Sequence, residues 1–217
     1  MNTPAIYLVD DDPSIITAVS RLLRVCGYDV RSFVSPKTFL EQHDANLPGC
    51  AVIDVAMPGL TGLAVQQALA GSGGERQIVF ITGEGDVPTS VTAMRAGAVD
   101  FLTKPFDEKH LLHAVETAIE RDRTGREARA ATAAIERLLA SLTLRERQVL
   151  VLVVEGRLNK QIASDLGIAE KTVKVHRGRM MEKMNVRSVA ELVRTTSPFL
   201  DHARAAAATQ DGESASS

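Results

Sequence analysis

Acidic, hydroxyl and ammonium side chains follow four short apolar segments in the first half of this chain. They are Asp10 and Asp11 after the first segment, Asp54 after the third, Thr82 after the fourth and Lys104 after the fifth. Clustered carboxylates attract a hard cation that prefers oxygen ligands, such as Mg²⁺. A carboxylate can also attack phosphorus, and an ammonium group, a hydroxyl and a cation can then stabilise the phosphoryl charge. The residue types therefore indicate cation-assisted phosphoryl chemistry.

Helix capping is the alternative explanation for aspartates that follow strands. Asp12 precedes a proline, which is a typical helix start, so we expect Asp12 to be a cap. Asp86 and Asp107, which open the fourth and fifth expected helices, fit the cap explanation still better. Asp54 differs, because the turn-forming residues 57–59 follow it and no helix starts there. Polar side chains follow four separate apolar segments, which argues that Asp10, Asp11, Asp54, Thr82 and Lys104 share one function.

Short apolar segments of strand length alternate with amphipathic segments of helix length. This alternation predicts a five-stranded parallel sheet with five helices on its two faces, in the doubly wound, flavodoxin-like α/β arrangement. Ligands of such sheets bind at the carboxyl ends of the strands, where the polar residues lie. The expected strands cover residues 5–9, 30–34, 50–53, 78–81 and 99–102, and the helices begin near residues 14, 35, 63, 86 and 107.

The two halves of the chain carry opposite net charges. Residues 1–123 hold 10 Lys and Arg against 16 Asp and Glu, a net charge of −6. Residues 124–217 hold 15 against 11, a net charge of +4. An acidic half joined to a basic half predicts two domains with different partners. We interpret residues 124–140, rich in Ala, Arg and Glu, as a helical linker that Gly125 could interrupt.

Beyond the linker the sequence shows helical patterns only, which predicts an all-α domain of four helices. Thr143 and Glu146 have the spacing of a capping box and mark the first helix. Residues 159–166 and 171–184 form the next two, separated by a short turn that contains glycine. Such a pair is typical of a helix-turn-helix, and a fourth helix is expected from Val189.

The third of these helices carries basic residues opposite an apolar face. A positive helix can enter the major groove of DNA, neutralise phosphates and reach base edges. A solvated helix with a positive outer face is the plainer alternative. The basic residues are Lys171, Lys174, Arg177, Arg179 and Lys183, and the apolar ones, on this helix and the one before, are Ile162, Ala163, Leu166, Val173 and Met180.

Composition excludes several other classes of protein. Hydrophobic residues make up 45% and charged residues 24% of the 217 residues, as in soluble globular proteins. No apolar run approaches the roughly 18 residues that span a membrane, and residues 1–4 do not begin a secretory signal. Cys26 and Cys50 form neither a disulfide framework nor a zinc site, so we expect two buried thiols in a reducing cytoplasm.

Residues 1–123 closely resemble the receiver domain of response regulators. The matching motifs, in chain order, are Asp10-Asp11, Val52-Ile53-Asp54, Met57-Pro58-Gly59, Ile81-Thr82-Gly83 and Lys104-Pro105-Phe106. The resemblance implies that Asp54 takes a phosphoryl group from a partner histidine kinase. Thr82 and Lys104 would contact the phosphoryl oxygens, and Phe101 would be an aromatic switch. A cis peptide bond would join Lys104 to the following proline.

The resemblance also implies a Mg²⁺ site. Asp11 and Asp54 would bind the ion together with the backbone carbonyl of Ala56, and Asp10 would support it indirectly, often through water. Ala56 is a departure, because relatives often carry arginine or another polar residue there. A polar side chain at that place can influence gain or loss of the phosphoryl group, whereas a carbonyl ligand does not depend on the side chain.

Residues 141–200 closely resemble the LuxR-type helix-turn-helix. The match runs from the Leu142-Thr143-Leu144-Arg145-Glu146 motif through Thr172-Val173-Lys174-Val175-His176 to Glu191-Leu192-Val193. It implies that Lys174 and Val175 face bases, and that two copies pair through the last helix, around residues 188–195. The further candidates for DNA contact are Lys160, Thr172, Arg177, Arg179 and Lys183.

A receiver followed by this output domain is the architecture of the NarL/FixJ family, and residues 81–88 look especially similar to FixJ. The resemblance implies a transcription regulator that forms a homodimer on phosphorylation and binds double-stranded promoter DNA, with RNA polymerase as a further candidate partner. The expected parts are a receiver at 1–123, a linker at 124–140, an output domain at 141–202 and a disordered tail at 203–217.

Two other functions remain open at this point. One is a DNA-binding protein whose receiver acts in dimerisation without phosphorylation, which the complete set of site residues disfavours. The other is a Mg²⁺-dependent phosphohydrolase that works through an aspartyl phosphate. Such an enzyme typically needs an acid–base aspartate two residues after the nucleophile, and Ala56 occupies that place. We therefore expect no catalysis beyond the receiver's own phosphorylation and dephosphorylation.

Overall fold

A computed structural model describes residues 3–71, 76–83 and 87–199 of the chain. It separates into two compact units, residues 1–127 and 128–217. The first unit therefore ends one helical turn later than the expected boundary at residue 123. The expected cap Asp86, residues 84–85 of the FixJ-like segment and the tail at 203–217 lie outside the described residues.

The first unit contains the expected parallel sheet. Its five strands lie in the order β2-β1-β3-β4-β5, and every neighbouring pair is parallel. All residues of β1 and β3 are buried, as in a sheet covered on both faces. The strands are β1 (Ala5–Val9), β2 (Asp29–Phe33), β3 (Gly49–Asp54), β4 (Gln77–Thr82) and β5 (Asp100–Thr103).

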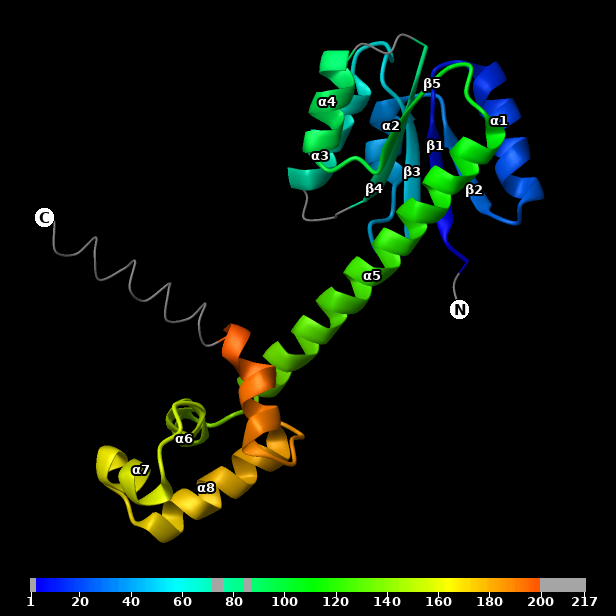
Figure 1. Ribbon diagram of the computed structural model, residues 1–217. Coiled ribbons are helices and arrows are strands. Elements are labelled where there is room, and N and C mark those ends of the chain that lie inside the picture. Colours follow the sequence, from blue (N-terminus) through cyan, green and yellow to red (C-terminus); the bar gives the residue numbers. More distant parts are fainter. Residues whose placement is uncertain (1–2, 72–75, 84–86, 200–217) are drawn as a thin grey trace, which may run out of the picture. The chain divides into compact units, whose positions relative to one another are not determined.

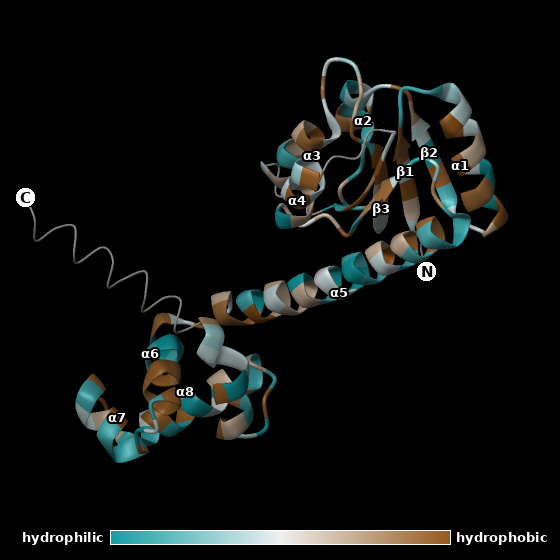
Figure 2. Ribbon diagram, turned by 45° about the horizontal axis from the view of Figure 1, so that its top comes forward, coloured by the Kyte–Doolittle hydropathy of each residue, from teal (hydrophilic) through white to brown (hydrophobic). Residues whose placement is uncertain are grey.

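Helices cover both faces of this sheet, α1 and α5 on one side and α2, α3 and α4 on the other (Figure 1). Colouring by hydropathy shows hydrophobic strands between helices whose outer faces are more hydrophilic (Figure 2). Asp12 caps α1 by accepting a hydrogen bond from the backbone N–H of Ser14, as expected. The helices are α1 (Pro13–Val25), α2 (Pro36–Gln42), α3 (Gly62–Gly71), α4 (Val87–Arg95) and α5 (Glu108–Ala140).

Helix α5 runs without interruption through Gly125, so a break at that glycine is wrong. A glycine inside a helix costs only about 1 kcal/mol relative to alanine, and good helix formers surround this one. Ion pairs on the same helix offset part of the cost. Arg123 lies 2.6 Å from Glu120 and 2.8 Å from Glu127. Gly125 stands between Arg123 and Glu127 in the sequence.

The second unit is all α, as predicted. Its helices are α6 (Leu144–Val154), α7 (Asn159–Leu166), α8 (Glu170–Lys183) and a further helix at residues 189–199. Thr143 and Glu146 form the expected capping box at the start of α6. Gly167 ends α7 with φ of 63°, a left-handed conformation that glycine adopts without strain. The predicted apolar face is in the core, since Ile162, Val173 and Met180 are fully buried.

The cysteines differ from expectation in one respect. Cys50 is buried in β3, and burial raises the pKa of its thiol to about 12. Cys26 is exposed, because it follows the last residue of α1, beyond the face that the helix packs on the sheet. Among the described residues, no helix combines the length and the apolar composition needed to cross a membrane.

Gly62 lies at the start of α3, against the backbone of Asp54. A Cβ atom at Gly62 would lie 2.4 Å from the Asp54 carbonyl oxygen. Replacing Gly62 by Ala should therefore destabilise the first unit by roughly 1–3 kcal/mol. Gly71 ends the same helix and has no atom within 4 Å of such a Cβ, so Gly71→Ala should be neutral or stabilising. Chemical denaturation of both variants tests this, and equal effects would contradict the close approach.

Candidate functional site

Two buried carboxylates and one ammonium group meet at the carboxyl end of the sheet. Asp10 follows β1, Asp54 ends β3 and Lys104 follows β5. The Nζ atom of Lys104 lies 2.6 Å from Oδ2 of Asp10 and 2.7 Å from Oδ1 of Asp54. Asp10 is fully buried and Asp54 is 3% exposed. The structure thus brings together three of the predicted site residues from three separate strand ends.

The charges of this cluster depend on one another. Burial raises the pKa of Asp10, and the hydrogen bond from Lys104 only partly opposes that effect. Burial lowers the pKa of Lys104, but its hydrogen bonds to Asp10 and Asp54 outweigh burial and leave the pKa above its ordinary value. Lys104 is therefore held as an ammonium ion between two carboxylates. One positive charge for two neighbouring negative ones leaves the cluster attractive to a further cation.

The other residues of the expected Mg²⁺ site lie around this cluster. Asp11 follows Asp10 in the loop after β1 and is exposed. The backbone N–H of Ala56 donates to Oδ2 of Asp54 at 2.7 Å, which fixes the turn after β3. Among the described residues, no three His, Cys, Asp or Glu side chains are grouped as a metal site. Mg²⁺ usually takes only one or two carboxylates and keeps several waters, so this donor set fits it.

Thr82 and Phe101 lie on the two strands beside the cluster. Thr82 ends β4, is fully buried, and accepts a hydrogen bond from the backbone N–H of Lys104 at its carbonyl, at 2.7 Å. The ring of Phe101 on β5 is half-buried, and its centroid lies 6.3 Å from that of Phe80 on β4. The peptide bond between Lys104 and Pro105 is cis, as the resemblance implied.

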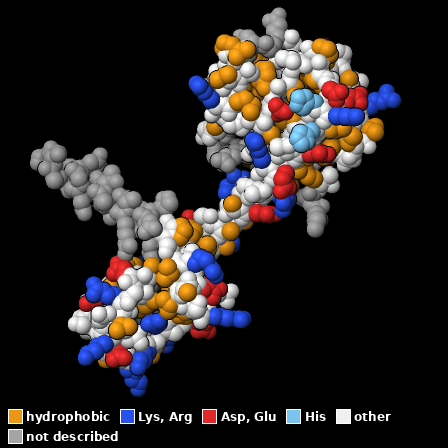
Figure 3. Space-filling model, in the orientation of Figure 1, with side chains coloured by type: hydrophobic (Ala, Val, Ile, Leu, Met, Phe, Trp, Pro, Cys, Tyr) orange, Lys and Arg blue, Asp and Glu red, His pale blue; other side chains and the backbone are white. Residues whose placement is uncertain are grey.

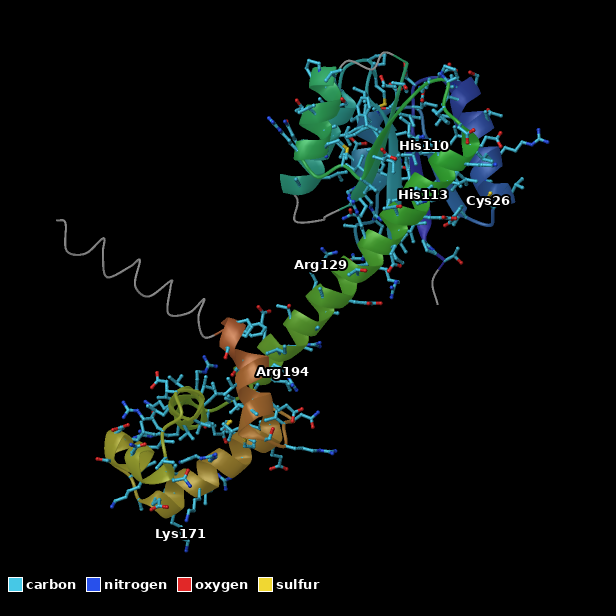
Figure 4. The ribbon with its side chains drawn as sticks, in the orientation of Figure 1. Cys26, His110, His113, Arg129, Lys171 and Arg194 are labelled. Atoms are coloured by element: carbon cyan, nitrogen blue, oxygen red, sulfur yellow. The ribbon has the colours of Figure 1, made fainter. Side chains whose placement is uncertain are left out.

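The second candidate site is the outer surface of α8. Lys and Arg side chains, with some acidic ones between them, project from the second unit in Figure 3, and Lys171 extends from the start of α8 in Figure 4. Val175 is 45% exposed, so an aliphatic side chain lies among the polar ones of this surface. Five of the predicted DNA contacts are exposed, namely Lys160, Thr172, Lys174, Val175 and Arg179.

Lys174 forms an exposed ion pair with Glu170 at 3.4 Å, and two other predicted DNA contacts bind residues outside α8. Arg177 is half-buried and donates to Oδ1 of Asn159, at 2.9 Å, which ties α8 to the start of α7. Lys183 donates to Oε2 of Glu146 at 2.7 Å and to the carbonyl of Ser141 at 3.2 Å. Lys183, a predicted DNA contact, therefore has two hydrogen-bond partners within the protein. Its ammonium group holds the end of α8 against the start of α6.

Glu146 is a structural residue that the capping-box pattern identified only in part. Its carboxylate is 3% exposed and accepts hydrogen bonds from Lys183 and from the backbone N–H of Thr143. The hydrogen bond from Lys183 is the largest of the effects that lower the pKa of Glu146 to about 2. The bond to Thr143 follows from spacing along the chain, but the bond to Lys183 joins residues 37 apart and has no local signal.

Glu146→Gln should destabilise the second unit by roughly 1.5–3 kcal/mol at pH 7, since it removes a charged hydrogen bond. The folded-state pKa is depressed, so the contribution is present above the ordinary value of 4.5 and is lost as pH falls towards 2. The parent and the variant should thus converge in melting temperature between pH 5 and pH 2. Glu182→Gln, an exposed change on α8, is the control. A difference in melting temperature that stays constant from pH 5 to pH 2 would contradict the stabilising role of the Glu146 carboxylate.

Comparisons with known proteins match both parts of the chain to known families. Residues 6–116 match the family described as response regulator receiver domain, and residues 140–196 match the bacterial regulatory proteins of the luxR family. Nodulation protein W of Bradyrhizobium diazoefficiens is 45% identical over 189 residues, which are 87% of this chain and 83% of that protein. Response regulator protein TmoT of Ectopseudomonas mendocina is 45% identical over 196 residues, 90% of this chain and 89% of that protein.

Solved structures show the same relationship. The response regulator StyR has a TM-score of 0.85 and 46% identity, over 91% of this chain and all of the StyR chain (100%). Full-length FixJ from B. japonicum has a TM-score of 0.57 and 36% identity, over 91% of this chain and 97% of the FixJ chain. The chain therefore belongs to the two-component response regulators of the NarL/FixJ family, in which a receiver domain precedes a LuxR-type helix-turn-helix domain.

Proposed function

We propose that phosphorylation of Asp54 by a partner histidine kinase switches this regulator and so controls transcription. The observation that carries the proposal is the Asp10–Lys104–Asp54 cluster, with distances of 2.6 and 2.7 Å, at the carboxyl end of the sheet. A structural ion pair would not need two buried carboxylates for a single lysine. The excess negative charge suits a Mg²⁺ ion, which would neutralise phosphoryl oxygens when bound.

In the proposed reaction, a carboxylate oxygen of Asp54 attacks the phosphorus of the kinase phosphohistidine. The new O–P bond forms as the N–P bond breaks, and the electron pair of the broken bond stays on the imidazole. Phosphorylation adds roughly −1.5 to −2 charges at Asp54. Lys104 already binds Asp54, so its ammonium can follow that charge onto the phosphoryl oxygens. Asp11, Asp54 and the backbone carbonyl of Ala56 would hold the ion, and Asp10 would support it indirectly.

The proposed switch connects this event to the surface of the receiver. Thr82, buried at the end of β4, would turn its hydroxyl towards the phosphoryl oxygens. Phe101 on the adjacent strand would then enter the space that Thr82 leaves. The free energy for such a change is limited to the difference in phosphoryl binding between the two states. The proposed result is a homodimer whose output domains bind promoter DNA, with RNA polymerase as a further candidate partner.

In the proposed DNA complex α8 lies in the major groove. Lys174 and Val175 occupy its first two turns, where helix-turn-helix proteins usually meet base edges. Lysine can bind guanine, and an aliphatic side chain can contact the methyl group of thymine. Arg179 lies about one turn beyond Val175 on α8, and Lys160 lies on α7; both are exposed and suit phosphates. Pairing of output domains would use the helix at residues 189–199.

Acetyl phosphate with Mg²⁺ should add one phosphoryl group to the parent protein, measured as intact mass. Asp54→Asn should abolish this addition, because an amide cannot form the acyl phosphate. The matched control is Asp12→Asn, since asparagine caps a helix as well as aspartate does. Labelling of the control should equal that of the parent, and omission of Mg²⁺ should reduce labelling of both. Undiminished labelling of Asp54→Asn would reject Asp54 as the acceptor.

Base contacts and phosphate contacts on α8 should separate in a DNA titration at several salt concentrations. Lys174→Ala should weaken binding to the preferred duplex by roughly 1–3 kcal/mol and relax the preference at one base pair. Arg179→Ala should weaken preferred and scrambled duplexes alike and reduce the salt slope by about one unit.

The structure supplies an internal control for this titration. Lys183→Met should leave the salt slope unchanged, because the Lys183 ammonium is bound to Glu146. If Lys174→Ala weakens both duplexes equally, Lys174 is a phosphate contact and the proposed placement of α8 is wrong.

A further inference from the structure

A second buried acidic group lies at the end of the sheet away from Asp54. Asp122 on α5 has a side chain that is 1% exposed. Its Oδ2 atom accepts hydrogen bonds from the backbone N–H of Gly49 and from Nε of Arg126, both at 2.8 Å. Gly49 begins β3 and Asp54 ends it, so this contact is a full strand length from the phosphorylation site. The proposed phosphoryl chemistry makes no use of it.

Arg126 extends the contact from α5 to the loop before β3. Besides Asp122, its guanidinium group binds three consecutive backbone carbonyls. Nη2 lies 2.8 Å from the oxygens of Ala45 and Leu47, and Nη1 lies 3.0 Å from the oxygen of Asn46. Because the guanidinium is a rigid planar fork, this arrangement restricts both its orientation and that of the helix that carries it.

A second arginine binds the same loop. Arg76, which is 7% exposed, donates to the carbonyls of Leu47 and Asp44 at 3.0 and 2.7 Å. Its guanidinium also lies 4.9 Å from the ring centroid of Tyr7 on β1. The carbonyls of residues 44–47 are thus shared between two arginines, and Leu47 accepts from both. Arg126 therefore binds a loop that the sheet already holds in place.

The apolar packing of α5 in the first unit does not reach Arg126. The last α5 residues in that core are Ala118 and Ile119. Arg126 lies seven residues further, about 10 Å along the helix. Arg123 is no substitute, because its ion pairs are with Glu120 and Glu127 of the same helix. Within this part of the described helix, Asp122 and Arg126 are thus what bind it to the receiver.

We propose that Arg126 is a positioning residue for signal output. By binding the carbonyls of residues 45–47, it makes α5 as far as residue 127 one rigid body with the receiver. A change in the receiver then moves the start of the linker. The inference rests on the proposed function only in its last step. The rigid attachment is a property of the receiver alone and is testable without phosphorylation.

Hydrogen exchange of the full-length protein tests the attachment. Arg126→Gln keeps a helix-forming residue but removes the charged fork. The amides of residues 120–127, and that of Gly49, should exchange faster by on the order of tenfold. Arg123→Gln on the same helix is the matched control and should change exchange at Gly49 little. Arg126→Lys keeps the charge but not the planar guanidinium, so its exchange rates should lie between those of the parent and of Arg126→Gln. Equal exchange at Gly49 in the two glutamine variants would overturn the proposal.

A DNA titration tests the transmission step. For each variant, the protein concentration that half-saturates a duplex selected by the parent protein is measured without and with acetyl phosphate and Mg²⁺. The ratio of the first concentration to the second reports how far phosphorylation strengthens DNA binding. Arg126→Gln should lower this ratio several-fold, while Asp54 labelling stays at the parent level and Arg123→Gln keeps the parent ratio. An unchanged ratio would overturn the role in output. A parent ratio of one would instead reject the proposed function, and the exchange result would still decide the attachment.

Discussion

The receiver depends on burying two carboxylates at adjacent strand ends. β1 and β3 are neighbours in the sheet, so Asp10 and Asp54 are forced together when the strands pair. Two buried charges of like sign are costly unless a cation lies between them. Lys104 supplies that cation from the end of β5, two strands away from β3. The remaining negative charge makes the site receptive to a metal ion, as the proposed function requires.

Nearly buried carboxylates paired with a cation also hold helices in place elsewhere in the described structure. Glu146 and Lys183 join the start of α6 to the end of α8. Asp122 and Arg126 join α5 to the start of β3 and to the loop before it. In each pair the carboxylate is nearly buried and also accepts a backbone N–H. A charged hydrogen bond inside protein is directional and costly to leave unmade, so it fixes orientation where apolar contact would allow sliding. In the output domain, the pair contributes to the orientation of α8 relative to α6.

Much of the fold was predictable, because its signals are local. Apolar segments of strand length separated by amphipathic segments placed all five strands within a residue or two of their observed bounds, and Asp12 and Thr143 marked helix starts correctly. Two expectations failed at places where local preference was weak. Gly125 did not interrupt α5, since strong helix formers and ion pairs surround it. Cys26 is exposed because it lies just past the packed face of α1.

The sequence by itself determined that acids, a hydroxyl and a lysine would meet at one edge of a parallel sheet, because strand polarity sends every carboxyl end there. It also determined a basic helix with an apolar inner face. Only the tertiary structure decided which charges remain available. Lys183 is bound to a glutamate 37 residues away, and Arg126 to carbonyls as far as 81 residues away. Such pairs leave no periodic pattern in the chain, because they form only after the elements that carry them have packed.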